Sequence, residues 1–265
     1  MRQAQIEALQ QRLCAAADTE LLQRFKRVDA EIKADGSLVT EADLLMQERM
    51  KRELADLCPE YGFLGEEMIH EQRQAQLESA GTGLWILDPL DGTSNFAVGI
   101  PYFAVSLALV INREVRLAVV YDPCRREFFH ALPGHGAWLN GQPLGRRRPL
   151  TPLAKGIGLV DYKRLPRGLA LRLAESPPYG SQRSFGSVAL DFCWVAAGRV
   201  HVYLHGRHDL WDYAAGLSIL HQAGGHSVTL EGQRNPPLGL QPRSTAAALD
   251  ADLFREWCAW LEISL

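Results

Sequence analysis

Apolar residues recur along the first 60 positions with helical spacing. Residues 3–28 carry Ile6, Leu9 and Leu13 three or four positions apart, which predicts an amphipathic helix. A second helix is predicted from Thr40 to Leu57, because its apolar positions keep the same period and Pro59 follows its end. Between these helices Asp35-Gly36 predicts a turn at the tip of a hairpin.

Short apolar runs dominate the next 80 positions and predict a sheet. The run at 85–87 lies between Gly83 and Pro89 and is too short for a typical helix, so it indicates a buried strand. Asn140-Gly141 predicts a two-residue hairpin turn. Residues 69–83 are polar, and we expect a mobile surface loop there. Further strands are predicted at 103–110, 115–121, 127–131 and 136–139.

In the second half of the chain, segments with the apolar pattern of strands alternate with segments that have the apolar pattern of helices. Strands are predicted at 156–160, 200–204, 226–230 and 246–249, and helices at 165–174, 187–197, 212–223 and near the C-terminus. The composition changes sharply over residues 143–155, so we place a boundary between an N-terminal half, 1–145, and a C-terminal half, 146–265. Strands that alternate with helices predict an α/β fold.

Composition narrows the class of protein. The chain has 265 residues, of which 47% are hydrophobic and 22% charged, as expected for a globular protein with a large core. The formal net charge of -3 gives no basic field for nucleic acid or an anionic membrane. Five scattered cysteines without a C-x-x-C motif indicate free thiols in a reducing cytoplasm. No signal-type or membrane-spanning run is present, so we expect a cytoplasmic protein without a membrane partner.

Candidate chemistry is concentrated where the strand at 85–87 ends. Asp88 and Asp91 place two carboxylates three residues apart, and Gly92 lets backbone approach a ligand closely. Thr93 or Ser94 can cap a short helix after them. Carboxylates suit Mg²⁺ and exposed N–H groups suit a phosphate, which indicates metal-assisted phosphoryl transfer. The alternative is ordinary turn chemistry, which such a pair of aspartates also provides.

Other acids have similar alternatives when they are taken singly. Glu66 and Glu67 form an adjacent pair that can simply be solvated. Thr40 with Asp43 has the spacing of a capping box, and Asp212 can be the N-cap of an Ala/Gly-rich helix. Together with Asp88 and Asp91, however, Glu66 and Asp212 supply four carboxylates, which would repel one another unless cations were bound between them.

The complete set of motifs resembles the inositol monophosphatase family of Mg²⁺-dependent, lithium-sensitive phosphatases. The chain has Gly65-Glu66-Glu67, then Asp88-Pro89-Leu90-Asp91-Gly92-Thr93, then Trp211-Asp212-Tyr213-Ala214-Ala215-Gly216, and finally Ala223-Gly224-Gly225. The resemblance covers nearly the whole chain, and the combination is highly specific. It implies a layered α/β/α/β/α sandwich, like that of fructose-1,6-bisphosphatase, and a homodimer.

The resemblance also implies roles for individual residues. Two Mg²⁺ ions are expected, with a third, weaker one beside Glu66. Thr93 and Asp43 would orient a nucleophilic water activated by the metal, Gly92 and Thr93 would hold the phosphate, and Lys33 would lie near the mouth of the site. The implied metal ligands are Glu66, Asp88, the Leu90 carbonyl, Asp91 and Asp212, and the implied catalytic set is Thr93, Asp43 and Glu66.

The substrate is less sharply defined. The resemblance places Asp91 and Asp212 as well as Gly92 and Thr93 around a small phosphorylated substrate, with inositol 1-phosphate as the default. His205 stands where inositol phosphatases have a glutamate, and Val188 where they often have alanine. A more cationic rim at His205 would favour 3′-phosphoadenosine 5′-phosphate or a sugar bisphosphate. The alternative is that His205 merely lines a solvent-filled rim.

A regulatory role is the competing class of function. Some bacterial relatives in this family assist transcription through protein and RNA contacts, and the run Arg146-Arg147-Arg148 is the feature here that points the same way. A solvated linker is the simpler interpretation of three charges on a short loop, so nucleic acid is not expected as a partner.

Overall fold

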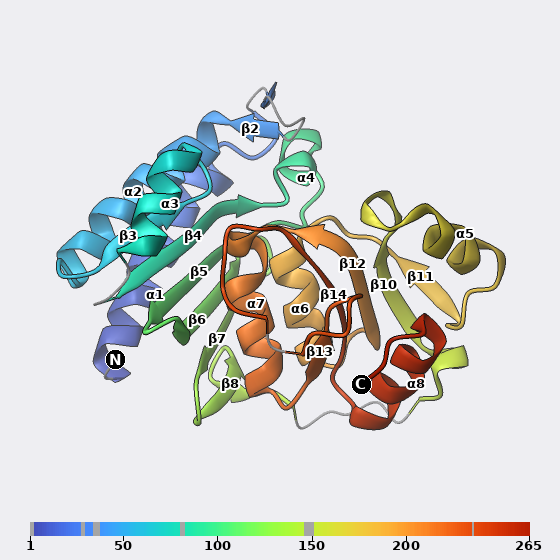
Figure 1. Ribbon diagram of the computed structural model, residues 1–265. Helices are drawn as coiled ribbons and strands as arrows, with labels where there is room; N and C mark the ends of the chain where they lie inside the picture. The colour runs from blue at the N-terminus through green and yellow to red at the C-terminus, as the bar shows by residue number, and fades with distance from the viewer. Residues whose placement is uncertain (1–2, 28–29, 34–37, 80–82, 146–150, 235) are drawn as a thin grey trace.

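Five layers of helix and sheet make up the protein, in the order α/β/α/β/α (Figure 1). The computed structural model describes residues 3–27, 30–33, 38–79, 83–145, 151–234 and 236–265. Three clusters of buried apolar residues fill the spaces between successive layers. The sandwich implied by the sequence motifs is therefore confirmed. Within the described ranges, no helix combines the length and apolar character needed to span a bilayer.

Two long helices form the first layer. Helix α1, Gln3–Ala17, continues into a π-helical turn at Asp18–Leu22, and α2, Glu41–Leu57, packs beside it (Figure 1). Both helices were predicted from their apolar period. Strands β1, Ala30–Ile32, and β2, Leu38–Thr40, pair in antiparallel fashion. The turn predicted at Asp35-Gly36 between them lies outside the described residues.

A seven-stranded sheet is the second layer. Its order is β3-β4-β5-β6-β7-β8-β9, with β3 parallel to β4 and every other neighbouring pair antiparallel. All eight residues of β4 are buried, and Trp85 and Leu87 face α1 and α2 while Leu84 and Ile86 face the third layer. This double burial explains the unbroken apolar run. The strands are β3 Gly62–Gly65, β4 Leu84–Asp91, β5 Ala104–Ile111, β6 Glu114–Asp122, β7 Glu127–Leu132, β8 Gly136–Leu139 and β9 Gln142–Pro143.

Two of the connections in this half bear directly on the sequence predictions. The prediction of a surface loop at 69–83 is wrong for most of these residues, because His70–Glu78 forms helix α3. None of the residues of α3 is buried, so the helix has no apolar stripe by which the sequence could reveal it. The hairpin turn at Asn140-Gly141 is confirmed, since both residues have positive φ angles of 47° and 77°.

The third layer consists of two helices between the sheets, α6, Val188–Ala196, and α7, Leu210–Gln222 (Figure 1). A Cβ atom at Gly216 of α7 would lie 3.0 Å from the Ala189 carbonyl oxygen and 3.0 Å from Phe192 Cβ on α6. The missing side chain thus allows the two helices to touch. Each helix begins near β4 and β5, and this brings two helix starts from the second half of the chain to the end of β4.

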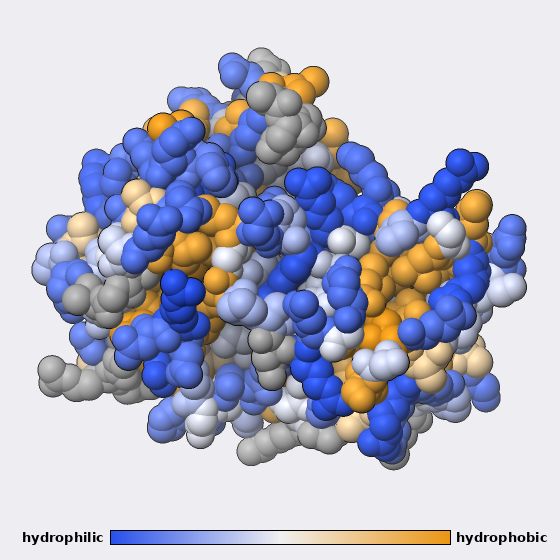
Figure 2. Space-filling view, in the orientation of Figure 1, coloured by the Kyte–Doolittle hydropathy of each residue, from blue (hydrophilic) through white to orange (hydrophobic). Residues whose placement is uncertain are grey.

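The fourth and fifth layers are a five-stranded sheet and its outer helices. The strand order is β11-β10-β12-β14-β13, in which β10, β11 and β12 are parallel and β14 is antiparallel to both of its neighbours. Figure 2 shows apolar surface between α5 and α8, the two helices that cover this sheet. The elements are β10 Ile157–Asp161, α5 Arg167–Glu175, β11 Ser181–Arg183, β12 Val202–His208, β13 His226–Val228, β14 Arg243–Ala248 and α8 Ala251–Leu261.

The two sheets come from successive parts of the chain. Strands β3 to β9 lie within 62–143 and strands β10 to β14 within 157–248. Residues 146–150 lie between them, outside the described residues, so the division into halves at 145 and 146 stays a prediction.

Candidate active site

The end of β4 is the centre of the site. Strand β4 delivers Asp88 and Asp91, both buried, and Gly92 then turns the chain into helix α4, Thr93–Val98. Gly92 has a φ of 97°, and a Cβ atom there would lie 3.0 Å from the Tyr102 carbonyl oxygen and 3.2 Å from that of Gly186. Any larger residue would therefore be strained and crowded at this turn.

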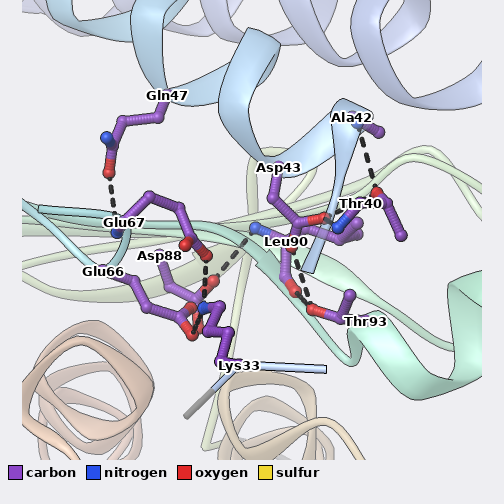
Figure 3. A network of polar contacts seen from close by, with 10 residues as sticks. All are labelled: Lys33, Thr40, Ala42, Asp43, Gln47, Glu66, Glu67, Asp88, Leu90 and Thr93. Atoms are coloured by element: carbon purple, nitrogen blue, oxygen red, sulfur yellow. Dashed lines mark hydrogen bonds and ion pairs between the residues drawn. The ribbon is translucent and has the colours of Figure 1, made fainter. Parts of the chain in front are cut away.

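Thr93 does not cap α4, contrary to the expectation for Thr93 or Ser94. Gly92 is the N-cap residue and no side chain caps the helix. The Thr93 hydroxyl oxygen instead lies 3.0 Å from Asp43 Oδ1 and 2.9 Å from the Leu90 carbonyl oxygen (Figure 3). These contacts fix the hydroxyl at the end of β4.

Asp43 contacts both Thr40 and Thr93. Its Oδ2 accepts hydrogen bonds from the backbone N–H and the hydroxyl of Thr40, at 2.7 Å and 2.6 Å, which completes a capping box at the start of α2. Its Oδ1 faces Thr93. Burial raises the pKa of Asp43 to about 6 although the hydrogen bonds from Thr40 and Thr93 favour the carboxylate. The capping box thus positions a carboxylate for Thr93.

Asp91 is held from the other half of the chain. Its carboxylate accepts hydrogen bonds from the Ser187 hydroxyl at 2.6 Å and from the N–H groups of Ala189 at 2.7 Å and Val188 at 3.2 Å. These donors are the N-cap residue and first turn of α6, where a negative charge is favoured. Burial nevertheless raises the pKa of Asp91 to about 6. The Val188 side chain is half-buried and packs against the core between the sheets.

Glu66 and Glu67 lie beside Asp88 because β3 runs parallel to β4. The Glu66 N–H donates to the Leu87 carbonyl oxygen at 3.1 Å, so the strand ends are side by side. Lys33 bridges the pair, with its Nζ 2.9 Å from Glu66 Oε1 and 2.6 Å from Glu67 Oε1 (Figure 3). Burial alone would lower the pKa of Lys33, but the two carboxylates outweigh it and raise the value. Lys33 therefore stays charged inside the site.

Asp212 reaches the site on α7, although it is not the N-cap residue that the alternative interpretation suggested. Asp209 is the N-cap, and Asp212, three positions later, accepts its N–H at 2.8 Å in a second capping box. The Ser106 hydroxyl of β5 donates to the Trp211 carbonyl oxygen at 2.9 Å and ties this helix start to the seven-stranded sheet. Burial, Asp91 and Glu66 raise the pKa of Asp212 well above its ordinary value.

Four carboxylates thus influence one another strongly. Burial raises the pKa of Asp88 well above its usual range, and Glu66, Asp91 and Asp212 add to the effect by repulsion. Their oxygens and the Leu90 carbonyl are hard donors of the kind that Mg²⁺ prefers, and a divalent cation would relieve this repulsion. The donor set therefore fits Mg²⁺.

The carboxylates are nevertheless turned towards protein donors. In the ranges that the structure describes, no three His, Cys, Asp or Glu side chains are gathered closely enough to hold a metal ion. Glu66 is paired with Lys33. Asp91 accepts hydrogen bonds from the start of α6, and Asp212 accepts one from the Asp209 N–H. A metal-bound arrangement requires some of these hydrogen bonds to be exchanged for bonds to the ion.

His205 does not lie on a solvent-filled rim, so that alternative is wrong. Its ring is buried, with Nε2 3.0 Å from Asp161 Oδ2 and Nδ1 accepting the Arg207 N–H at 3.2 Å. Asp161 and His205 are direct neighbours in the parallel strands β10 and β12. Since both ring nitrogens are engaged, a contact between His205 and substrate stays a prediction that requires a rearrangement.

Sequence reasoning missed Ser187 as a partner of Asp91 and Ser106 as a partner of α7. Both contacts join residues about 100 positions apart, since Asp91 and Ser187 are separated by 96 positions and Ser106 and Trp211 by 105. Gly186-Ser187 did indicate the start of a helix, which was the available signal. The Arg146-Arg147-Arg148 run lies outside the described residues.

Comparison with known proteins finds a matching family and similar sequences. The sequence model of the inositol monophosphatase family matches residues 2–259. An inositol-1-monophosphatase of Rhizobium meliloti is 37% identical over 216 residues, 80% of this chain and 79% of that protein. The Nus factor SuhB of Xylella fastidiosa is 34% identical over 201 residues, 74% of this chain and 70% of that protein.

Solved structures give the same result. The extragenic suppressor protein suhB of Bartonella henselae superimposes with a TM-score of 0.84 and 28% identity, over 99% of this chain and 100% of that one. The match of the family model over nearly the whole length, the sequence relatives and the shared fold lead to one conclusion: the chain belongs to the inositol monophosphatase family.

Proposed function

We propose that the protein is a Mg²⁺-dependent phosphomonoesterase that hydrolyses a small polyol phosphate, with inositol 1-phosphate as its first candidate substrate. One observation carries the proposal: Glu66 from the turn after β3, Asp88 and Asp91 from β4, and Asp212 from α7 influence one another beside the Gly92-Thr93 turn. The name of the Rhizobium meliloti relative supports this choice of substrate.

Each group of site residues has a role in the proposal, beginning with the metal ligands. Glu66, Asp88, Asp91, Asp212 and the Leu90 carbonyl would hold two Mg²⁺ ions, with a third beside Glu66. When bound, Mg²⁺ supplies positive charge to the phosphoryl oxygens and makes water a stronger nucleophile.

The Thr93 hydroxyl lies between Asp43 Oδ1 and the Leu90 carbonyl oxygen, where it can orient the attacking water. Asp43 accepts the proton of that hydroxyl in a hydrogen bond and so keeps the hydroxyl oxygen free to accept from water. The N–H groups of Gly92 and Thr93 would bind the phosphate, and Glu66 completes the catalytic set.

Asp212→Asn tests the proposal, because the change keeps the size of the side chain and the oxygen that accepts the Asp209 N–H while it removes the charge. We expect kcat/KM for inositol 1-phosphate at saturating Mg²⁺ to fall at least a hundredfold, with EDTA abolishing the activity of the unmodified protein and Li⁺ inhibiting it. Asp250→Asn, at the N-cap of α8, is the matched control and should leave the activity unchanged. Full activity of the unmodified protein in EDTA would refute the proposal.

The alternative substrates belong to the same reaction class. A panel containing inositol 1-phosphate, 3′-phosphoadenosine 5′-phosphate and a sugar bisphosphate would separate them by kcat/KM. With His205 paired to Asp161, the cationic rim that favoured a second phosphate is reduced to the exposed Arg207. A polyol monophosphate therefore remains the first candidate substrate.

A regulatory role in transcription is a second candidate, because several of the similar proteins are named SuhB and three of these are named Nus factors. Asp91→Asn separates the two functions: it should abolish hydrolysis and leave binding to a transcription partner unchanged. We further propose a cytoplasmic homodimer, for which light scattering after gel filtration should give twice the chain mass of 29.5 kDa.

A further inference from the structure

A cavity of about 350 Å³ lies along α7, among residues that do not belong to the carboxylate site. Its walls come from the start of β6, from α7 between Tyr213 and Gln222, and from Arg234, Pro236, Leu238 and Arg243 before and at the start of β14. A smaller cavity of about 260 Å³ adjoins it and shares His221 and Arg234 with it. The larger volume falls within the range of small-molecule sites, roughly 300–1,000 Å³.

The charge in this cavity is strongly one-sided. Arg113, Arg234 and Arg243 line it, and Glu114 is the single acid among the lining residues that the structure describes. The Glu114 carboxylate is already paired with Arg116 at 2.9 Å. Among the described residues, none of the three lining arginines forms an ion pair with a carboxylate. No carboxylate in the described part of the chain therefore neutralises their positive charge.

Arg243 forms part of the wall in a fixed orientation. Its guanidinium carbon lies 3.6 Å from the centroid of the Tyr213 ring, and its Nη1 donates to the Pro236 carbonyl oxygen at 3.2 Å. Its Nε is buried and has no hydrogen-bond partner among the described residues. A buried donor without a partner is costly, and an acceptor from a ligand would satisfy it. Arg113 and Arg234 also line the cavity, and both are exposed.

The remaining walls are largely apolar. Val115, Leu217, Pro236 and Leu238 face the same space as the arginines. A planar guanidinium forms two parallel hydrogen bonds with a phosphate or carboxylate group, while apolar walls favour a carbon body. We propose that this cavity binds a small organic oxyanion, in which a phosphate or carboxylate group is attached to an apolar body.

Such a ligand would contact the helix that carries Asp212. Tyr213, Ala214, Leu217 and Ser218 of α7 line the cavity, and Tyr213 follows Asp212 directly in the chain. The two sites thus lie on the same helix, since the oxyanion cavity runs along α7 from Tyr213 to Gln222 and Asp212 is in its first turn.

Calorimetric titration with three aromatic probes tests the proposal. The probes are phenylphosphonate, whose P–C bond a phosphomonoesterase does not cleave, benzoate, and the neutral benzyl alcohol. The titrations are done in EDTA, so that the result does not depend on the proposed phosphatase activity. We expect an anionic probe to bind and benzyl alcohol not to bind, and the tighter of the two anions identifies the oxyanion. Binding of the alcohol as tight as that of both anions, or no binding of either anion, would overturn the proposal.

Variants then locate the binding. Arg113→Gln combined with Arg234→Gln changes exposed residues and should weaken the anion at least tenfold, whereas Arg116→Gln, already paired with Glu114, should change it less than twofold. Hydrogen exchange should slow at 213–222 and 234–243 when the anion is present. Slowing confined to 88–93 and 187–189, or equal affinities of the two variants, would place the anion elsewhere and overturn the inference.

Discussion

The bond from Ser187 to Asp91 offers a sharp test of how the two parts of the chain build one site. Ser187→Ala removes a single buried hydroxyl, whose oxygen lies 2.6 Å from Asp91 Oδ2. The N–H groups of Val188 and Ala189 still donate to the same carboxylate, so Asp91 keeps two of its three partners. The change therefore isolates one contact between β4 and α6.

The expected cost follows from the kind of bond that is lost. A hydrogen bond to a charged group contributes about 1.5–3 kcal/mol to stability. Because two backbone donors remain, we expect the lower part of this range, about 1.5–2 kcal/mol in the free energy of unfolding. That corresponds to roughly a 10- to 30-fold change in the unfolding equilibrium constant. Less restraint on Asp91 should also lower kcat/KM about tenfold.

Urea unfolding followed by circular dichroism measures the first quantity, and phosphate release from inositol 1-phosphate measures the second. Ser184→Ala is the matched control, since Ser184 is exposed and lies three positions earlier in the same segment. It should differ from the unmodified protein by less than 0.5 kcal/mol, as is typical of roughly neutral surface changes. If Ser187→Ala unfolds at the same urea concentration as Ser184→Ala, the hydroxyl does not stabilise the carboxylate and the reasoning fails.

Two further predictions concern the turn after β4 and the stability in acid. Gly92→Ala should lower the free energy of unfolding by about 1–3 kcal/mol, because the residue has a φ of 97° and the added Cβ would lie 3.0 Å from a carbonyl oxygen. Gly134→Ala is the control in the same urea assay and should lower it less, because Gly134 has a φ of 76° but open space around it. Burial lowers the pKa of His221 to about 4, so below pH 6.5 the unfolded chain binds a proton that the folded chain does not. Stability should therefore fall by about 2 kcal/mol between pH 7 and pH 5 from this residue alone, and His221→Gln should flatten the profile; an unchanged slope would contradict the assignment.

The apolar pattern predicted most of the layers because burial on both faces leaves a strong signal. Strand β4 is buried throughout and was correctly predicted from its apolar run. Helix α3 was missed for the opposite reason: none of its residues is buried, and it is attached by polar contacts. Gln76 accepts the Phe63 N–H at 3.2 Å, and the Arg73 guanidinium lies 4.6 Å from the Trp211 ring centroid. Contacts of this kind join distant residues and have no period in the sequence.

In the candidate site, too, local motifs could be predicted from the sequence and contacts between distant residues could not. Asp88 and Asp91 stand out locally, because two carboxylates after a buried strand form a short motif. The partners of the site residues could not be predicted in this way, since each depends on the register of strands or on how helices pack. Asp161 meets His205 because β10 and β12 pair at that register, and the sequence alone does not contain that alignment.

The hydrogen bonds from the start of α6 to Asp91 have a consequence for folding during synthesis. Ser187 and Ala189 leave the ribosome 96 and 98 residues after Asp91, and Asp212 follows later still. A nascent chain that ends near residue 145 already holds Glu66, Asp88 and Asp91, but it lacks every donor that α6 gives to Asp91. Contacts of such long sequence separation are slow to form, and the four carboxylates cannot come together before Asp212 has been translated.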